Sequence, residues 1–76
     1  MFSAVKLVTT DGIIFERVGD IIHVDSNIGG YRKSGDYDYF FYAETFDISK
    51  EDKLKFENKV NELIREVIMM ENKIES

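Results

Sequence analysis

Few side chains in this sequence could carry chemistry. His23 is the only histidine and there is no cysteine, so a catalytic triad, a histidine metal cluster and a thiolate site all lack necessary groups. Asp36 and Asp38 would share one face of a strand, and paired carboxylates can perform acid-base chemistry or hold a divalent cation. Fifteen acidic residues among 76 produce such pairs by chance. We therefore predict a protein that is not an enzyme and has neither a metal site nor a cofactor.

The sequence also lacks the signature motifs of common catalytic sites. It contains no Walker-type loop, no dinucleotide-binding fingerprint, no HExxH and no GxSxG. The glycines of residues 29–35, GGYRKSG, do not stand between a strand and a helix, which is the context that phosphate-binding loops need. The motifs therefore indicate a binding or structural role.

The adjacent basic residues Arg32 and Lys33 follow Tyr31 in a segment rich in glycine and polar residues, 26–36. We expect this segment to be a long loop, and long loops in compact domains are either mobile or functional. The pair could contact a phosphate, a carboxylate or a nucleic-acid strand. The alternative is a solvated, flexible tip.

The segment 37–46, YDYFFYAETF, is dense in aromatic residues and favours a strand. Alternation places aromatic side chains on both of its faces, so one face can pack on a core while the other is left for recognition. Acidic residues accompany the aromatics and would repel phosphates, which favours a protein over unpaired bases as the partner. The candidate partner-binding residues are Asp36, Asp38, Tyr39, Tyr42 and Glu44, with Arg32 and Lys33 as a rim.

The charge distribution indicates the kind of partner. The net charge is −5 and the sequence pI is about 4.7, with −4 carried by residues 1–48 and −1 by the remainder. We therefore predict a small acidic module that docks on the basic surface of a protein, as an inhibitor or adaptor of a nucleic-acid-handling protein would. The alternatives are an assembly homodimer with no separate ligand and a weak binder of single-stranded nucleic acid. Direct binding of a nucleic-acid backbone is not expected.

Turn signals divide the first half of the chain into strands. Asp11-Gly12 and Gly19-Asp20 each have the form of a two-residue hairpin turn. We predict strands at 2–10, 13–18, 21–25 and 37–46. In these registers Val8 opposes Phe15, Val5 opposes Val18, Phe15 opposes Val24 and Glu16 opposes His23.

The last third of the chain predicts one long helix, 49–75. Its apolar residues recur in steps of four and three, which forms a single stripe. Ser49 and Asp52 have the spacing of a capping box at the first turn. The whole chain, 1–76, is then one α+β domain in which a four-stranded antiparallel meander packs on the helix (ββββα). The place of the last strand, beside the third or beside the first, stays open.

The apolar stripe of the helix extends beyond the expected length of the sheet. A helix of about 27 residues spans about 40 Å, whereas strands of about seven residues cover about 23 Å. An uncovered stripe indicates an interface, and its spacing suits packing against a second helix. The expected homodimer interface comprises Val60, Leu63, Ile64, Val67, Met70 and Ile74. The alternative is a helix that bends or ends early.

The cellular compartment is expected to be the cytoplasm. The absence of cysteine fits a reducing environment. The N-terminus lacks a basic segment followed by an apolar run, and no apolar run approaches the length of a membrane span. No membrane partner is therefore expected.

Overall fold

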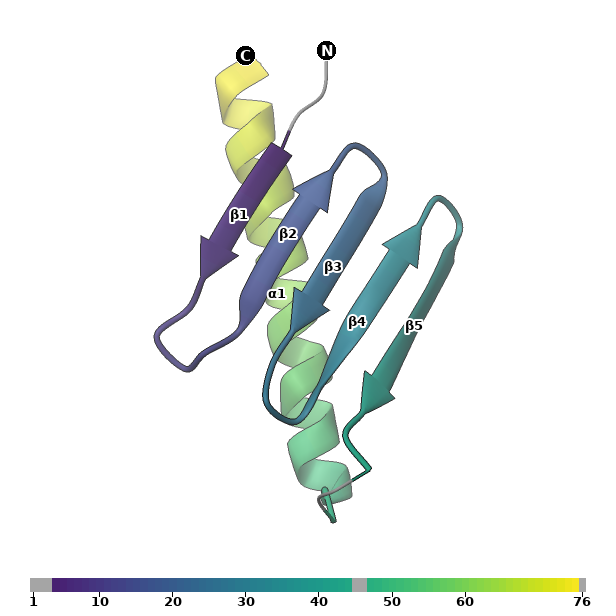
Figure 1. The fold of residues 1–76 in the computed structure, drawn as a ribbon. Coiled ribbons are helices and arrows are strands. Elements are labelled where there is room, and N and C mark those ends of the chain that lie inside the picture. Colours follow the sequence, from purple (N-terminus) through teal and green to yellow (C-terminus); the bar gives the residue numbers. More distant parts are fainter. Residues whose placement is uncertain (1–3, 45–46, 76) are drawn as a thin grey trace.

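The computed structural model describes residues 4–44 and 47–75, with helix side chains as far as Glu71. Five antiparallel strands form one sheet, and a single helix lies across one face of it (Figure 1). The elements are β1 (Ala4–Val8), β2 (Ile14–Val18), β3 (Ile21–Asp25), β4 (Gly29–Ser34), β5 (Tyr37–Tyr42) and α1 (Lys50–Glu75). The predicted α+β arrangement of a meander on a C-terminal helix is confirmed, but the sheet has five strands where we expected four.

The fifth strand is β4, in the segment expected to be a loop. It joins β5 through a two-residue turn, Gly35-Asp36, in which Gly35 has a φ of 60°. This turn repeats the Gly19-Asp20 turn between β2 and β3, where Gly19 has a φ of 59°. Two identical Gly-Asp dipeptides therefore close two hairpins at the same end of the sheet (Figure 1).

Two consecutive glycines, Gly29 and Gly30, make β4 hard to predict from the sequence because glycine is normally depleted in strands. Here the close approach of neighbouring groups requires them. A Cβ atom on Gly29 would lie 2.2 Å from the carbonyl oxygen of Phe41, and one on Gly30 would lie 2.5 Å from the ring of Phe41. The strand thus excludes larger residues where β5 packs against it.

The strand order is β1-β2-β3-β4-β5, so β5 pairs with β4 and lies at the edge opposite β1. Insertion of β4 decides the order that the sequence left open. Each strand follows its neighbour through a short connection, which keeps the sheet a simple meander.

The register between β1 and β2 differs by one residue from the expected one. Leu7 opposes Phe15 and Val8 opposes Ile14, because the connection is a three-residue loop in which Gly12 has a φ of 88°. The amide of Thr9 donates to the carbonyl of Ile13 over 2.9 Å, which closes the loop one residue earlier than a two-residue turn would.

The register between β2 and β3 is the expected one. Phe15 opposes Val24, and Glu16 opposes His23. The two-residue turn at Gly19 was therefore correctly predicted.

The core lies between the inner face of the sheet and α1. The helix begins after Ser49, whose Oγ accepts the amide of Asp52 over 3.1 Å, as the capping signal predicted. Its apolar stripe then packs on side chains from β2, β3 and β4. The buried residues are Ile13, Phe15, Ile22, Val24, Tyr31, Phe56, Val60, Leu63 and Val67.

The burial of Val60, Leu63 and Val67 corrects the dimer interface expected on the helix. These residues contact the sheet of their own chain and have no surface for a second copy. The sheet reaches farther along the helix than strand length suggested because α1 crosses it obliquely (Figure 1). Arg17 of β2 also donates to the carboxylate of Glu71, about one turn beyond Val67.

The other helix candidates differ in exposure. Ile64 is half-buried against the core, and Met70 is 51% exposed. Ile74 lies outside the described side chains. A helix-mediated contact stays a prediction only for the exposed side of the last turns, which includes Met70 with neighbouring Ile68 and Met69.

Replacing Val67, which is 2% exposed, by lysine is expected to lower the free energy of unfolding by several kcal/mol. An unpaired buried charge costs about 3–5 kcal/mol, while a chain of this size has a total stability of about 4–11 kcal/mol. Met70→Lys is the matched control and should change the free energy of unfolding by less than about 1 kcal/mol. Urea unfolding followed by circular dichroism measures both. Equal stability of the two variants would contradict the arrangement in which α1 turns Val67 toward the sheet and Met70 toward solvent.

Candidate protein-binding surface

The two faces of the sheet have different environments. Alternate residues of each strand point toward α1, and the others point away from it onto a face that no described element covers (Figure 1). We call this second face the outer sheet face. It comprises Ala4, Lys6, Val8, Ile14, Glu16, Val18, Ile21, His23, Asp25, Arg32, Ser34, Tyr37, Tyr39 and Phe41.

Exposed apolar side chains gather on the outer sheet face. Seven of the eleven large hydrophobic residues that are exposed in the described chain lie there, between 38% and 69% exposed. They are Val8, Ile14, Val18, Ile21, Tyr37, Tyr39 and Phe41. So many exposed apolar side chains on one face of a small protein make this face a candidate interaction site.

The aromatic residues of β5 form one edge of this patch. The ring centroids of Tyr37 and Tyr39 are 5.7 Å apart, and those of Tyr39 and Phe41 are 6.2 Å apart, both in tilted arrangements. These distances are typical of favourable aromatic pairs. The row is therefore preordered by its own contacts and loses little side-chain entropy on binding.

The charged residues of the outer sheet face neutralise one another. Lys6 on β1 lies 3.8 Å from Glu16 on β2, and Arg32 on β4 lies 2.8 Å from Asp25 on β3. Each of the two basic residues is therefore paired with one acidic residue of a neighbouring strand. The charged side chains of the outer sheet face therefore sum to a net charge near zero.

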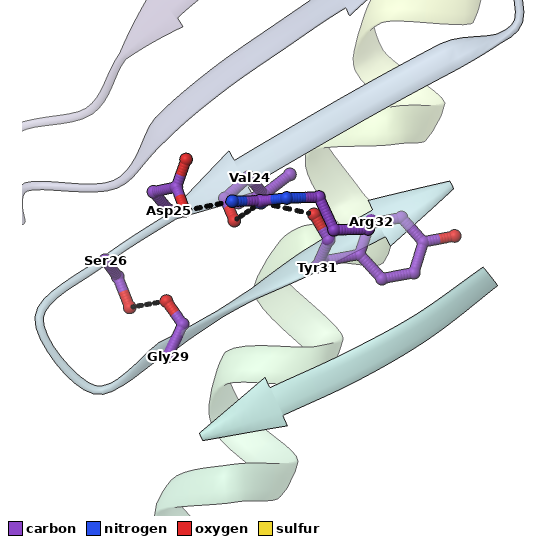
Figure 2. A network of polar contacts seen from close by, with 6 residues as sticks. All are labelled: Val24, Asp25, Ser26, Gly29, Tyr31 and Arg32. Atoms are coloured by element: carbon purple, nitrogen blue, oxygen red, sulfur yellow. Dashed lines mark hydrogen bonds and ion pairs between the residues drawn. The ribbon is translucent and has the colours of Figure 1, made fainter. Parts of the chain in front are cut away.

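Arg32 is fixed by several contacts at once, as Figure 2 shows. Its Nη1 donates to the carbonyls of Val24 and Tyr31, each over 3.0 Å, and its Nη2 donates to Asp25 Oδ1 over 2.8 Å. The guanidinium carbon also lies 5.0 Å from the centroid of the Phe41 ring, a cation–π distance. Arg32 thereby links β3, through Val24 and Asp25, to the aromatic row of β5, through Phe41.

The seven residues proposed from sequence as partner contacts do not form one surface. Tyr39 and Arg32 oppose each other on neighbouring strands of the outer sheet face. Asp36 occupies the β4–β5 turn, and Glu44 is exposed after β5. Lys33 and Asp38 oppose each other on the inner side of the sheet.

Tyr42 belongs to the core side of β5. Its ring packs edge-on against Phe56 of α1, with centroids 6.1 Å apart, and its hydroxyl donates to the carboxylate of Glu57. Burial, with the adjacent charge of Glu57 and this hydrogen bond, raises the pKa of Tyr42 above its ordinary value. Tyr42 therefore anchors the helix to the sheet and is half-buried.

Asp38 has a comparable structural role. It accepts a hydrogen bond from the hydroxyl of Tyr31 over 3.0 Å. Burial, followed by the hydrogen bond and charge of Asp38, raises the pKa of Tyr31 to about 12. The inner aromatics Tyr31 and Phe40, with centroids 4.6 Å apart, continue this cluster toward Phe56.

The acidic residues of the sheet half are dispersed. Asp11, Asp20 and Asp36 lie in three different turns, at both ends of the sheet (Figure 1). Thr9 donates to Asp11, and this bond holds the pKa of that carboxyl below its ordinary value. Net acidity in residues 1–48 therefore does not produce an acidic face.

A hollow of about 530 Å³ opens beside the β1–β2 loop, where the β3–β4 turn approaches the first half of α1. Its floor is apolar, with Ile13 and Phe56, and its rim mixes acids with Lys55 and Lys59. No cluster of three metal-ligating side chains occurs in the described part of the chain. Nor does any described helical segment have the length and apolarity needed to cross a membrane.

The apolar outer residues of β2 and β3 were not among the sequence candidates. Their signal was present: Val18 and Ile21 flank the Gly19-Asp20 turn, and β2 and β3 carry apolar residues on both faces. A half-solvated strand would alternate apolar with polar residues. Apolar residues at both the odd and the even positions of a strand indicate that both of its faces are buried or bound.

The hydroxyls of Tyr31 and Tyr42 are expected to make the fold sensitive to alkali. Both pKa values are raised, so this contribution to stability is complete below the unfolded tyrosine pKa of about 10 and disappears as the pH rises toward 12. Urea midpoints measured at about pH 8 and about pH 11 should therefore differ more for the unmodified protein than for Tyr31→Phe or Tyr42→Phe. An alkaline loss of the same size in all three proteins would contradict the described hydroxyl environments.

The chain was compared with models of protein families, with curated proteins and with solved structures, and no match was found. Its function is therefore argued from the geometry of its surfaces. The outer sheet face is the surface on which exposed apolar and aromatic side chains are concentrated.

Proposed function

We propose that this protein is a non-catalytic protein-binding module and that the outer sheet face is its binding surface. The observation that carries the proposal is the concentration of seven exposed large apolar side chains on one face that α1 leaves uncovered. Aromatic residues are enriched at the centre of protein interfaces, and Tyr37, Tyr39 and Phe41 supply three of them here.

The chemistry of the face indicates the chemistry of the partner. Its charges are paired within the chain by the contacts of Lys6 with Glu16 and of Arg32 with Asp25. A strongly basic surface would meet no excess of acid there. The partner that fits is a protein surface with an apolar centre and little net charge.

The same pairing argues against single-stranded nucleic acid. Proteins that stack bases on aromatic rings also supply cations to the phosphates. On the outer sheet face Arg32 donates to Asp25 and Lys6 lies near Glu16. The aromatic row therefore lacks the excess positive charge that a phosphate backbone requires.

The second candidate function is docking on a basic protein partner. In that case this chain would be an inhibitor or adaptor of a nucleic-acid-handling protein. The observation in its favour is that Asp20 and Asp36 occupy the two Gly-Asp turns at one end of the sheet, and Asp38 follows directly in β5 (Figure 1). Such a contact would be electrostatic and would weaken with salt. It would use the turn end of the sheet in place of its outer face.

Photo-crosslinking in the native host identifies what lies on each surface. A photoreactive phenylalanine at position 39 samples the outer sheet face, and one at position 54 samples the exposed side of the helix, where Leu54 is 59% exposed. We expect position 39 to capture one protein that position 54 does not. Equal capture from both positions would contradict the proposal.

One single and one double substitution then separate the two candidates, with the captured protein in purified form. Tyr39→Lys is expected to weaken its affinity at least tenfold, because it removes the middle ring of the aromatic row and places a charge beside the exposed apolar residues. Asp36→Asn combined with Asp38→Asn is expected to leave the affinity within about threefold and its salt dependence unchanged. Titration calorimetry at low and high salt measures both effects. The reverse outcome would assign the contact to the acidic turn end.

A further inference from the structure

The geometry points to a second copy of this chain as the occupant of the outer sheet face, packed face to face about a two-fold axis parallel to β3. This inference rests on the proposed function and names the partner. A two-fold contact joins the same patch on both copies, so the patch must complement itself. The pattern of charges on the face provides that complementarity.

The register arranges the outer sheet face into three rows that run across the strands. The middle row contains Lys6, Glu16, His23, Arg32 and Tyr39, one from each strand in order. The rows on either side of it contain most of the exposed apolar residues. Because β3 is the central strand, a two-fold axis along it places β2 of one copy over β4 of the other, and β1 over β5.

This axis opposes unlike charges on the strands beside β3. His23 and Asp25, on β3 itself, face their own copies, and each Asp25 is paired with Arg32 of its own chain. Glu16 of each copy faces Arg32 of the other, and this contact occurs twice. Arg32 uses Nη1 and one N–H of Nη2 in its contacts within the chain, and the guanidinium has five N–H groups, so two are left to donate. Lys6 of each copy faces Tyr39 of the other, where an ammonium group can lie over the ring.

A face-to-face axis perpendicular to the strands, along the middle row, brings more like charges together. It would place Lys6 on Lys6, Glu16 on Glu16 and Arg32 on Arg32 of the second copy. Like charges directly opposed across an interface cost several kcal/mol. The charge pattern therefore selects the axis along β3.

The apolar rows also match under the selected axis. Ile21 faces Ile21 of the second copy at the two-fold axis, and Val8 on β1 faces Phe41 on β5. Ala4 faces Tyr37 in the same way. Small and large residues thus oppose each other at the two edges, which lets sheets about 10 Å apart interdigitate.

The size of the face sets the strength of the dimer. Five strands about 4.8 Å apart and about 18 Å long cover roughly 430 Å² on each copy. A total near 850 Å² lies at the weak end of specific interfaces. The dimer is therefore expected to form at tens to hundreds of micromolar and to exchange with monomer.

A charge exchange between copies tests the inference. Glu16→Arg opposes two bases in its own dimer, and Arg32→Glu opposes two acids. Each variant alone should therefore stay monomeric. An equimolar mixture restores both unlike pairs, so it should regain the two-chain mass. Light scattering at concentrations up to about 500 µM measures all four samples.

The outcomes decide the inference. Restoration by mixing supports it. A one-chain mass for the unmodified protein throughout the range would overturn it. A two-chain mass that neither variant reduces would also overturn it, because the contact would then lie on another surface, such as the exposed end of α1 around Met69.

A second measurement does not depend on the folding of Arg32→Glu. Ile21→Cys puts the only thiol of the chain at the two-fold axis, where a short bismaleimide should link two copies. Leu54→Cys, on the exposed side of the helix, is the matched control. Linkage at position 54 and not at position 21 would overturn the inference.

Failure of the dimer and failure of the proposed function are distinguishable. If the unmodified protein is monomeric and position 39 still captures a different protein in the host, the outer sheet face binds that protein and only the inference is wrong. If neither self-association nor capture involves this face, both are wrong.

Discussion

One helix can cover only one face of a five-stranded sheet, and this constraint determines the rest of the structure. The stripe of α1 fits the inner face so closely that Val60 is fully buried. The opposite face has no second layer in the described chain, although β2, β3 and β5 place apolar residues on it. A sheet normally solves this problem with polar outward residues. Here seven large apolar residues are among those that point outward, and this departure supports the proposed binding role.

Polar contacts at the edges of the core fix the helix in one position. The hydroxyl of Tyr42 donates to Glu57 in the first half of α1, and Arg17 donates to Glu71 near its other end. Tyr42 and Arg17 are residue types that often contact partner proteins from an exposed position. Because they hold the helix against the sheet, the outer sheet face is presented on a rigid support, which lowers the entropy lost on binding.

Local signals in the sequence predicted those elements whose structure is decided locally. Ser49 marks the helix start, the Gly19-Asp20 turn sets the β2–β3 register, and alternation in β5 places Tyr39 and Phe40 on opposite faces. The β1–β2 register was missed because of a local feature, the three-residue loop that ends at Gly12, and the other errors came from nonlocal contacts. Gly29 and Gly30 argue against a strand until the ring of Phe41 is known to lie against them.

The candidate site was predicted only in part for the same reason. Tyr39 and Arg32 were identified, but nothing local assigns Tyr42 to Phe56 or Asp38 to Tyr31. Net charge was a poor guide because acids in turns and acids on a face contribute equally to it. The burial of Val67 likewise depends on the oblique path of α1, which the period of its stripe does not specify.

The most direct test of the central claim is the solvent accessibility of methyl groups in an extract of the native host. A soluble paramagnetic chelate broadens the NMR signals of exposed methyls, so the signals of Val18 and Ile21 on the outer sheet face can be compared with that of Leu54 on the helix. All three side chains are exposed in a single copy of the chain, so the isolated protein at a concentration too low for self-association is the reference. If the face is a binding surface, Val18 and Ile21 become protected in the extract while Leu54 stays accessible. Equal broadening of all three in the extract would contradict the account.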